Sequence, residues 1–473
     1  MEPLELLFIP APLMGHIGQA IELANILTNH FNHITITVLI MQLPIDPIGT
    51  NYTKSLSSTT SSDRIKFIQL PPLPLDLFTG YTSTGELRDM VLEKNKPQVR
   101  DILSKRLNEP NLTPRLAACV VSMFTTTLME VVNEFNLPTY VFFASNAAYL
   151  GTMLYLQNLQ DEHGLDVPNL AKSETEFMIP SYINPVPTKL MSFPIADPHS
   201  WKTRTLLYAR RYRQAKGIIV NTFMDLEKHP LLSYDNKTPP VYAVGPMIKP
   251  EPSPPDNEIL NWLKCQPKSS VVLLCFGSRG WFTENQVKEI AFGIEKSGYK
   301  FIWSLRRPPT EGLKGFPGEY MDFNEVLPDG FLERTYGRGK VIGWVPQQAV
   351  LSNEAIGGFV THCGWNSVLE SIWYGVPMAT WPIYAEQQLD AFQLVKELGL
   401  AVEISLDYNE RNENQELVRA QDIENGIRKL MDGNINNKIR SKVLEMKNVS
   451  RMALQEGGPS FTSLKRLVDG FAS

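Results

Sequence analysis

The chain has 473 residues, of which 43% are hydrophobic and 20% charged, and its formal net charge at pH 7 is −5. This composition is that of a globular protein and not of a disordered one, and it lacks the basic excess of a nucleic-acid-binding protein. The four cysteines are too scattered for a zinc ribbon or a disulfide framework. We expect neither a signal peptide nor a membrane span, because no basic segment precedes an apolar run and no apolar stretch reaches about 18 residues. A cytoplasmic protein is the prediction.

Short apolar runs alternate with helical stretches over the first third of the chain. Apolar or alternating runs that predict strands lie at 4–10, 34–40, 64–70, 116–123 and 140–144. Helical periodicity lies between them, at 17–29, 87–107 and 128–135. Nearly continuous apolar strands alternating with helices are typical of a parallel sheet that is buried on both faces.

The same alternation returns in the second half of the chain. Strands are predicted at 270–276, 301–305, 341–344, 358–361, 378–383 and 402–405. Helices are predicted at 284–296, 367–374, 389–398, 420–432, 438–451 and 462–471. A proline-dense stretch at 239–255 separates the halves and reads as a linker, and 308–330 reads as a surface loop. The fold class is therefore α/β, with two doubly wound domains and a ligand cleft between them at the carboxyl ends of the strands.

The segment from Trp344 to Gln387 holds the most chemistry. A strand ends before His362, and the turn that follows leads directly into a helix, where free backbone N–H groups favour an anion such as a phosphate. Structural explanations compete with this one. Ser367 and Glu370 fit a capping box, Asn366 fits a helix cap, and His362 and the tryptophans could be core residues.

These 44 residues resemble the signature box of the plant family 1 UDP-glycosyltransferases. The matching motifs are W-x-P-Q, H-C-G-W-N-S, E-S, G-V-P, W-P and E-Q-Q, at fixed spacings. The resemblance extends over essentially the whole chain, through P-x-x-G-H near residue 16, V-G-P at 244–246 and F-G-S at 276–278.

The resemblance implies a GT-B fold and an inverting transferase that uses UDP-glucose as co-substrate, with no cofactor and no metal. It implies an acceptor-binding domain at 1–245, a linker at 246–258, a donor-binding domain at 259–455 and a final helix at 456–473 that returns to the first domain. The expected partners are the UDP-sugar and a small hydrophobic acceptor, and a monomer is expected, without nucleic acid or membrane span.

The resemblance also assigns the donor site. Trp344 should stack on uracil, the backbone of Val345 should read the uracil edge, and Glu370 should accept the ribose hydroxyls. The diphosphate should lie on His362, Asn366, Ser367 and Ser278, at a helix amino terminus. Trp365, Glu386 and Gln387 should contact the sugar, with Gln387 favouring glucose, and Gln347 belongs to the same site.

His16 follows the first strand and is the expected general base, because a neutral imidazole can take a proton from an acceptor hydroxyl. A histidine there could instead cap the following helix. The family places a carboxylate beside this histidine, but here Ser122 occupies that position. Three explanations remain open: the Ser122 hydroxyl fixes the imidazole tautomer, the acceptor is an acidic phenol or carboxylate that needs little help, or the enzyme is impaired or uses another partner.

The acceptor pocket should be apolar and should come from the first half of the chain. The candidates are Met14, Phe124, Phe143, Asn146 and Tyr149, each of which could also be a core residue. Two other functions stay in view. A nucleotide-cofactor oxidoreductase would need G-x-G-x-x-G after the first strand, which the sequence lacks, and a UDP-sugar-binding pseudoenzyme is compatible with Ser122.

Overall fold

The structure is a computed structural model that describes most of the chain. The described residues are 2–44, 53, 63–81, 83–108, 114–173, 175–248, 257–309, 316–410, 415–433 and 437–472. Most of the predicted linker, residues 249–256, and residues 310–315 of the predicted surface loop lie outside them.

The first half is a parallel sheet in the order β3-β2-β1-β4-β5-β8-β9. Its strands are β1 (Leu4–Ile9), β2 (Ile34–Ile40), β3 (Ile65–Gln69), β4 (Arg115–Ser122), β5 (Thr139–Phe143), β8 (Gly217–Val220) and β9 (Val241–Ala243). The longer helices are α1 (Met14–His30), α3 (Thr84–Asn108) and α5 (Ala147–His163). Shorter ones are α4 (Met129–Asn133), α6 (Val167–Ala171), α7 (Phe193–Ala196), α8 (Pro198–Ser200), α9 (Leu206–Tyr212) and α10 (Lys228–Leu232). A small hairpin pairs β6 (Glu176–Phe177) with β7 (Val186–Pro187).

The second half is another parallel sheet, in the order β12-β11-β10-β13-β14-β15. Its strands are β10 (Val271–Cys275), β11 (Lys300–Ser304), β12 (Gly339–Ile342), β13 (Ile356–Thr361), β14 (Met378–Thr380) and β15 (Ala401–Glu403). Its helices are α11 (Glu258–Lys264), α12 (Glu284–Ser297), α13 (Phe331–Arg334), α14 (Gln347–Leu351), α15 (Trp365–Tyr374), α16 (Gln387–Phe392), α17 (Ala420–Met431), α18 (Asn437–Ala453) and α19 (Pro459–Ala472).

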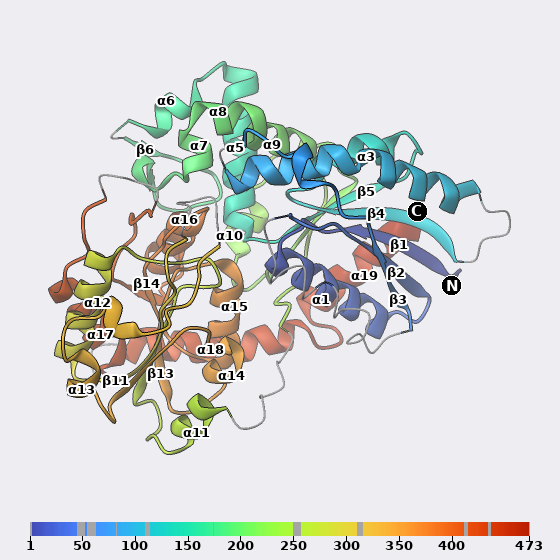
Figure 1. The fold of residues 1–473 in the computed structure, drawn as a ribbon. Helices are drawn as coiled ribbons and strands as arrows, with labels where there is room; N and C mark the ends of the chain where they lie inside the picture. The colour runs from blue at the N-terminus through green and yellow to red at the C-terminus, as the bar shows by residue number, and fades with distance from the viewer. Residues whose placement is uncertain are drawn as a thin grey trace.

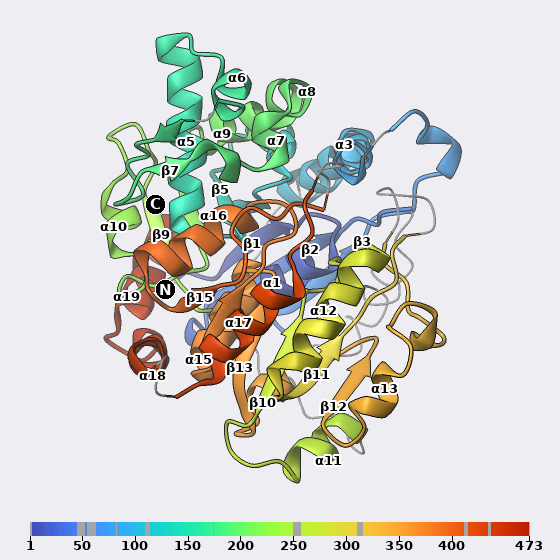
Figure 2. The same ribbon diagram turned by 90° about the vertical axis from the view of Figure 1, so that its left-hand side faces the viewer.

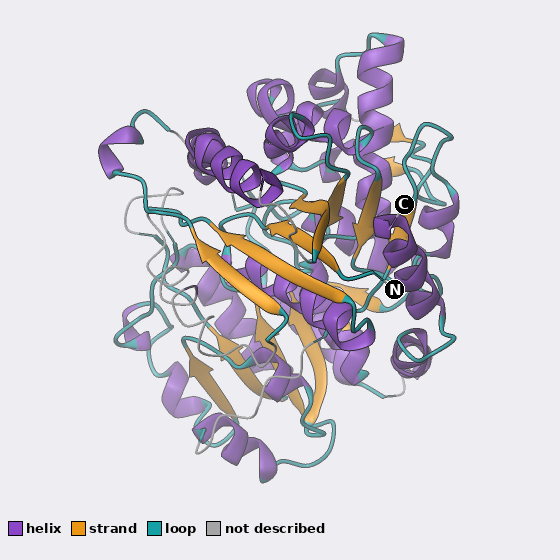
Figure 3. Cartoon of the chain, turned by 90° about the vertical axis from the view of Figure 1, so that its right-hand side faces the viewer, coloured by secondary structure: helices purple, strands orange, loops and turns teal. Residues whose placement is uncertain are grey.

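Helices cover both faces of each sheet, which explains why the strands are apolar almost throughout (Figures 1 and 3). In the first half, α3 and α5 pack on one face, and α1 packs on the other. In the second half, α15 and α18 share one face, and α12 and α17 share the other. The α/β prediction with two Rossmann-like halves is confirmed.

The last helix, α19, packs against the sheet of the first half, as Figure 2 also shows. The ring of Phe471 meets the ring of Tyr140 edge-on at 4.8 Å, and the Tyr140 hydroxyl donates to the Gly470 carbonyl at 2.8 Å. No helix in the described ranges is both long enough and apolar enough to cross a membrane.

Several element boundaries differ from the sequence-based ones at places that matter for the site. The first helix begins at Met14, so His16 lies in its first turn. The strand predicted to include Trp344 ends at Ile342, which leaves the tryptophan in a loop. The helix predicted from Ser367 begins two residues earlier. Polar or glycine-rich turns obscure where the periodicity starts, so strand ends and helix starts are the least predictable positions.

Candidate active site

The predicted donor residues lie after four strands of the second sheet. Ser278 follows β10, Trp344 follows β12, His362 follows β13 and Glu386 follows β14. All four strands are parallel, so these loops emerge at the same edge of the sheet. The fold thereby gathers residues separated by more than a hundred positions.

His362 is packed tightly between two glycines. A Cβ atom at Gly277 would lie 2.5 Å from its Nε2 atom, and one at Gly364 would lie 2.6 Å away, so a side chain at either position would collide with the ring. Burial lowers the pKa of His362 from 6.5 to about 4, so the imidazole is neutral at pH 7. Its Nδ1 atom is buried and has no hydrogen-bond partner among the described residues. A satisfied core histidine would bond both nitrogens, which favours a ligand-binding role.

Helix α15 begins at Trp365, and its cap is Gly364, which makes no side-chain cap bond. Asn366 and Ser367 therefore lie in the first turn, and the two capping explanations for these residues are wrong. The Oδ1 atom of Asn366 is buried without a partner in the described part of the chain. The first turn of a ten-residue helix that has no capping side chain keeps its N–H groups available to an anion.

Glu370 is held by two glutamines from α14. Gln347 donates to its Oε2 atom at 2.6 Å, and Gln348 donates to its Oε1 atom at 3.1 Å. Gln347 also donates to the Ser367 hydroxyl at 2.9 Å. Gln347 therefore lies in the predicted donor site, where it positions Glu370. No sequence pattern singles out Gln348, although its neighbour belongs to the matched W-x-P-Q motif.

Trp344 exposes 55% of its surface. This is unusual for tryptophan, whose large side chain is highly buried on average in folded proteins. The guanidinium of Arg306 lies 5.6 Å from its ring centre. Val345 beside it is buried. An exposed indole at the carboxyl edge of a sheet is a surface on which a planar base can stack.

Trp365 and Gln387 each form hydrogen bonds to the protein backbone through one polar group. The indole of Trp365 donates to the Asn221 carbonyl at 2.7 Å, which joins the second half to the loop after β8. The Oε1 atom of Gln387 accepts from the backbone N–H groups of Ile383 and Tyr384, both at 3.0 Å. These bonds fix the loop that ends at Glu386.

Two turns of this edge adopt a backbone conformation that side chains disfavour. Cys363, after His362, has a φ of 65°, and Ala385, before Glu386, has a φ of 57°. Left-handed backbone at residues other than glycine costs free energy and clusters at functional sites. Burial raises the pKa of the Glu386 carboxyl.

In the first half, His16 and Ser122 come from neighbouring strands. His16 follows β1, and Ser122 is the last residue of β4, which pairs with β1. Thr125, which the sequence analysis missed, ties the two strand ends together: its hydroxyl donates to the Ile9 carbonyl at 2.7 Å and accepts from the Ser122 N–H at 2.8 Å. His16 Nδ1 and Ser122 Oγ are buried, and neither has a partner among the residues that the structure describes.

The surroundings of His16 are aromatic and positively charged. The ring of Phe124 meets the imidazole edge-on at 5.0 Å. Burial, followed by the nearby charges of Arg88 and Arg279, lowers the pKa of His16 from 6.5 to about 4. Arg279 follows Ser278 in the loop after β10, and it donates to the Thr84 hydroxyl of α3 at 3.3 Å. The loop of the second sheet therefore reaches the histidine of the first.

The predicted acceptor residues divide into two groups. Met14 is half-buried at the start of α1, and Phe124 touches His16. Phe143 is instead fully buried, with Tyr149 and Tyr212 around it at 6.0 and 5.5 Å. We therefore count Phe143 and Tyr149 as core residues.

Asn146 is also committed to the fold. Its carbonyl accepts from the Tyr149 N–H at 2.7 Å and caps α5, and its amide donates to Asp390 at 2.7 Å and Gln393 at 3.0 Å. These bonds use both of its amide hydrogens, so we withdraw Asn146 as an acceptor contact.

Comparison with known proteins identifies the family. A family model described as UDP-glucoronosyl and UDP-glucosyl transferase matches residues 203–443. The chain is 47% identical to UDP-glycosyltransferase 71A15 of Malus domestica over 476 residues, covering 99% of each sequence. It is 45% identical to UDP-glucose flavonoid 3-O-glucosyltransferase 6 of Fragaria ananassa, covering 98% of each.

Solved structures agree with this assignment. A transferase of Siraitia grosvenorii in complex with UDP superposes with a TM-score of 0.88 at 40% identity, covering 99% of this chain and 100% of the other. A Medicago truncatula enzyme complexed with UDP-glucose gives 0.86 at 38% identity, covering 99% and 98%. Both relatives were solved with the nucleotide that the loops after β10, β12, β13 and β14 were predicted to bind. The chain is a UDP-glycosyltransferase with the GT-B fold and belongs to the plant family 1 enzymes.

Proposed function

We propose that this enzyme transfers glucose from UDP-glucose to a small lipophilic plant metabolite with inversion at the anomeric carbon, forming a β-glucoside. The observation that carries the proposal is the contact between the halves. Arg279, next to Ser278 in the predicted diphosphate loop, bonds Thr84 and acts electrostatically on His16. A donor on the second sheet would therefore present its anomeric carbon to the histidine of the first.

The donor residues take the following roles in this proposal. The exposed Trp344 ring stacks on uracil, the Val345 backbone reads its edge, and Glu370 accepts the ribose hydroxyls. The first turn of α15, with Asn366 and Ser367, holds the diphosphate together with His362 and Ser278. The helix dipole and the free N–H groups stabilise the charge that builds on the leaving UDP. Trp365, Glu386 and Gln387 hold the sugar.

His16 serves as the general base toward a hydroxyl acceptor. The imidazole accepts the hydroxyl proton, the oxygen attacks the anomeric carbon opposite the diphosphate, and the bond to UDP breaks. The low pKa keeps His16 neutral and ready to accept a proton at neutral pH. It also makes the imidazole a weak base, which favours acidic acceptors over aliphatic alcohols.

Ser122 is the departure from the family pattern. Its hydroxyl can orient His16, directly or through a water molecule, but it cannot stabilise an imidazolium as a carboxylate would. An acceptor that loses its proton easily compensates for this. Phenols and flavonoids are such acceptors, and relatives named as flavonoid 3-O-glucosyltransferases support that class. Terpenoid alcohols are the more demanding case.

Mass spectrometry tests the proposal. The purified protein is mixed with UDP-glucose and a panel of phenols, flavonoids, terpenoid alcohols and carboxylic acids, and the products are searched for an added hexose. Transfer to a phenol or flavonoid in the wild type that His16→Ala lowers by about 10²-fold or more would support the proposal. If calorimetry shows UDP-glucose binding and no acceptor is modified, the protein is a pseudoenzyme and the proposal is wrong.

A further inference from the structure

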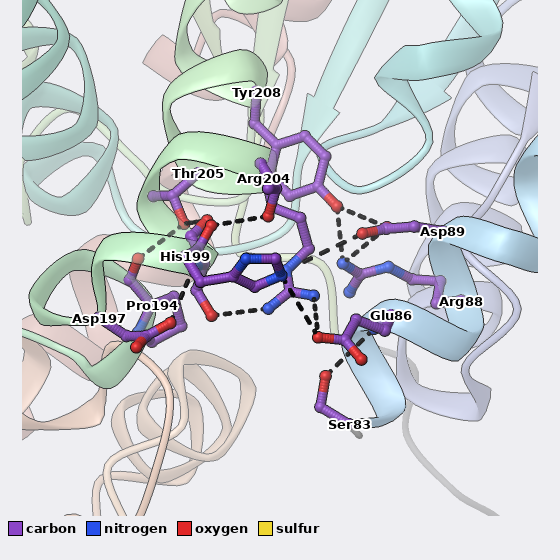
Figure 4. Close-up of polar contacts among 12 residues, drawn as sticks. Ser83, Glu86, Arg88, Asp89, Pro194, Asp197, His199, Arg204, Thr205 and Tyr208 are labelled. Atoms are coloured by element: carbon purple, nitrogen blue, oxygen red, sulfur yellow. Dashed lines mark hydrogen bonds and ion pairs between the residues drawn. The ribbon is translucent and has the colours of Figure 1, made fainter. Parts of the chain in front are cut away.

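A buried arginine lies beside the predicted acceptor pocket and has no role in the reaction described so far. Arg88, in α3, exposes only 8% of its surface. Its Nη2 atom donates to the Tyr208 hydroxyl at 2.7 Å and to Asp89 at 3.3 Å (Figure 4). Tyr208 in turn donates to Asp89 at 2.9 Å. The sequence analysis did not select Arg88, because one arginine in a charged helix has no distinguishing pattern.

The guanidinium is not fully satisfied by these partners. Its Nε atom is buried and has no hydrogen-bond partner within the described ranges. A guanidinium keeps its charge at every physiological pH, and a buried charged donor without an acceptor is costly. An acceptor that arrives with a ligand is one explanation of such a donor. A carboxylate is a ligand group whose oxygens match the N–H donors of a guanidinium.

Arg88 is close to the reacting centre. Its Cζ atom lies 4.2 Å from the centre of the Phe124 ring, and the centre of the His16 ring lies 5.0 Å from the same point. The guanidinium carbon and the imidazole centre are therefore at most about 9 Å apart, the sum of those two distances. A small acceptor whose carboxylate bonds Arg88 would therefore lie within a few ångströms of His16 and of the Phe124 ring that both contact.

The charges around His16 also favour an anionic acceptor. Within the part of the chain that the structure describes, the charged groups that shift its pKa are Arg88 and Arg279, and both lower it. Ser122, where the family has a carboxylate, adds no negative charge. A site built in this way holds a weak base and two cations, so it is suited to a nucleophile that arrives already deprotonated.

We propose that the preferred acceptor is a small aromatic or otherwise lipophilic carboxylic acid, held as its carboxylate by Arg88, and that the product is a glucose ester. This inference rests on the proposed glucosyl transfer and names its acceptor class. One carboxylate oxygen attacks the anomeric carbon with its own electron pair, and the bond from that carbon to UDP breaks. No proton is transferred, because the negative charge of the carboxylate passes to the leaving UDP. Ser122 is then sufficient, since His16 has no proton to remove.

A second arginine in the same cluster provides a matched control. Arg204 donates to the Ser200 hydroxyl at 2.7 Å and lies 3.6 Å from Glu86 and 3.9 Å from Asp89. Like Arg88, Arg204 is largely buried. The cation that lies over the Phe124 ring beside His16, however, is the guanidinium of Arg88. Removing either arginine disturbs Asp89, which contacts both. Of the two, Arg88 is the one that contacts Phe124 beside His16.

The test uses 4-hydroxybenzoate, which offers a carboxylate and a phenol in one molecule. The glucose ester is cleaved by neutral hydroxylamine and the phenolic glucoside is not, so both products are quantified in one reaction. We expect the wild type to form mainly the ester, and Arg88→Leu to lower the ratio of ester to glucoside by about tenfold or more. Arg204→Leu should leave this ratio unchanged. The ratio is insensitive to the fraction of folded enzyme, so partial misfolding of a variant does not mimic the result.

Three results overturn the inference: mainly glucoside from the wild type, an equal loss of both products in Arg88→Leu, or the same shift of the ratio in Arg204→Leu. Arg88→Lys gives a second check. Lysine keeps the positive charge but lacks the paired N–H donors of a guanidinium, so this variant should form more ester than Arg88→Leu and less than the wild type. Failure here is distinct from failure of the proposed function. If phenol and benzoate are both unreactive although UDP-glucose binds, glucosyl transfer itself is refuted. If phenol is glucosylated and benzoate is not, only the carboxylate acceptor is refuted.

Discussion

The carboxyl edges of the two sheets hold their functional side chains in different ways. On the second sheet, most of the predicted donor residues lie in one continuous segment, in which Gln347 and Gln348 orient Glu370 and which also carries the buried atoms of His362 and Asn366 that are unpaired among the described residues. On the first sheet, His16, Ser122 and Arg88 come from separate segments, and each has a buried polar atom without a partner in the described part of the chain.

This difference corresponds to what each edge binds. A nucleotide sugar is the same molecule for every relative that uses it, so the residues that bind it can lie at fixed spacings in one segment. An acceptor differs from enzyme to enzyme, and the unpaired atoms on the first sheet are groups that an acceptor can complete. We therefore expect mutations on the second sheet to affect all acceptors alike, and mutations on the first sheet to affect them selectively.

The largest expected effect is that of His16→Ala. With a phenolic acceptor, kcat should fall by about 10²–10⁴-fold, the usual contribution of a positioned general base. With a carboxylate acceptor the loss should be smaller, because no proton is removed. Steady-state kinetics with phenol and benzoate measure both, and calorimetry should give an unchanged Kd for UDP-glucose. A variant that binds the donor much more weakly would place His16 in the donor site instead.

Trp344→Ala should weaken donor binding for every acceptor. Loss of a base-stacking surface costs about 1–3 kcal/mol, which corresponds to about a 5- to 150-fold increase in the Kd of UDP. Because the ring is 55% exposed, the melting temperature should change little. Trp373→Ala is the control, since that indole lies 5.1 Å from the Arg451 guanidinium, away from the predicted site. Equal effects of the two variants on UDP binding would refute stacking on Trp344.

The sequence carries more information about the second edge than about the first, for a physical reason. Trp344, His362 and Glu370 lie within 27 residues, so their spacing carries a signal that can be matched. Arg88 contacts Phe124, and Phe124 contacts His16, only because β1 and β4 are neighbours and α3 packs over them. Contacts between distant segments leave no spacing pattern in the sequence of a single chain.

The same limit explains the residues that were misjudged. Phe143 ends β5 and Asn146 follows it, at the sheet edge where Phe124 follows β4, and hydrophobicity and position alone do not separate a pocket wall from the core. Their partners decide the matter, because Asn146 bonds Asp390 across the two halves. The α/β alternation, in contrast, was readable because burial on both faces imposes it on each strand separately.

Ser122→Asp should restore the expected charge beside His16. A carboxylate within about 4–6 Å raises the pKa of a histidine by about 1–3 units. His16 accepts a proton only when it is neutral, that is above its pKa, so the acid limb of the pH–rate profile should move upward from about pH 4. At neutral pH the rate with a phenol should rise by about tenfold, because the base is stronger. Ser122→Asn is the uncharged control, and an unchanged acid limb in Ser122→Asp would show that residue 122 does not act on His16.

The smallest expected effect is that of Gln348→Leu, which removes one of the two amides that hold Glu370. A hydrogen bond of this kind contributes about 0.5–1.5 kcal/mol, so the Kd of UDP should rise by about 2- to 10-fold, with no change in the preference among acceptors. If Gln348 acts by orienting Glu370 toward the ribose, the loss should be smaller with 2′-deoxy-UDP, which lacks one of the two hydroxyls that Glu370 is proposed to accept. A loss of the same size with both nucleotides would mean that Gln348 supports the loop in general, and that the second edge is less finely built for its nucleotide than its hydrogen bonds indicate.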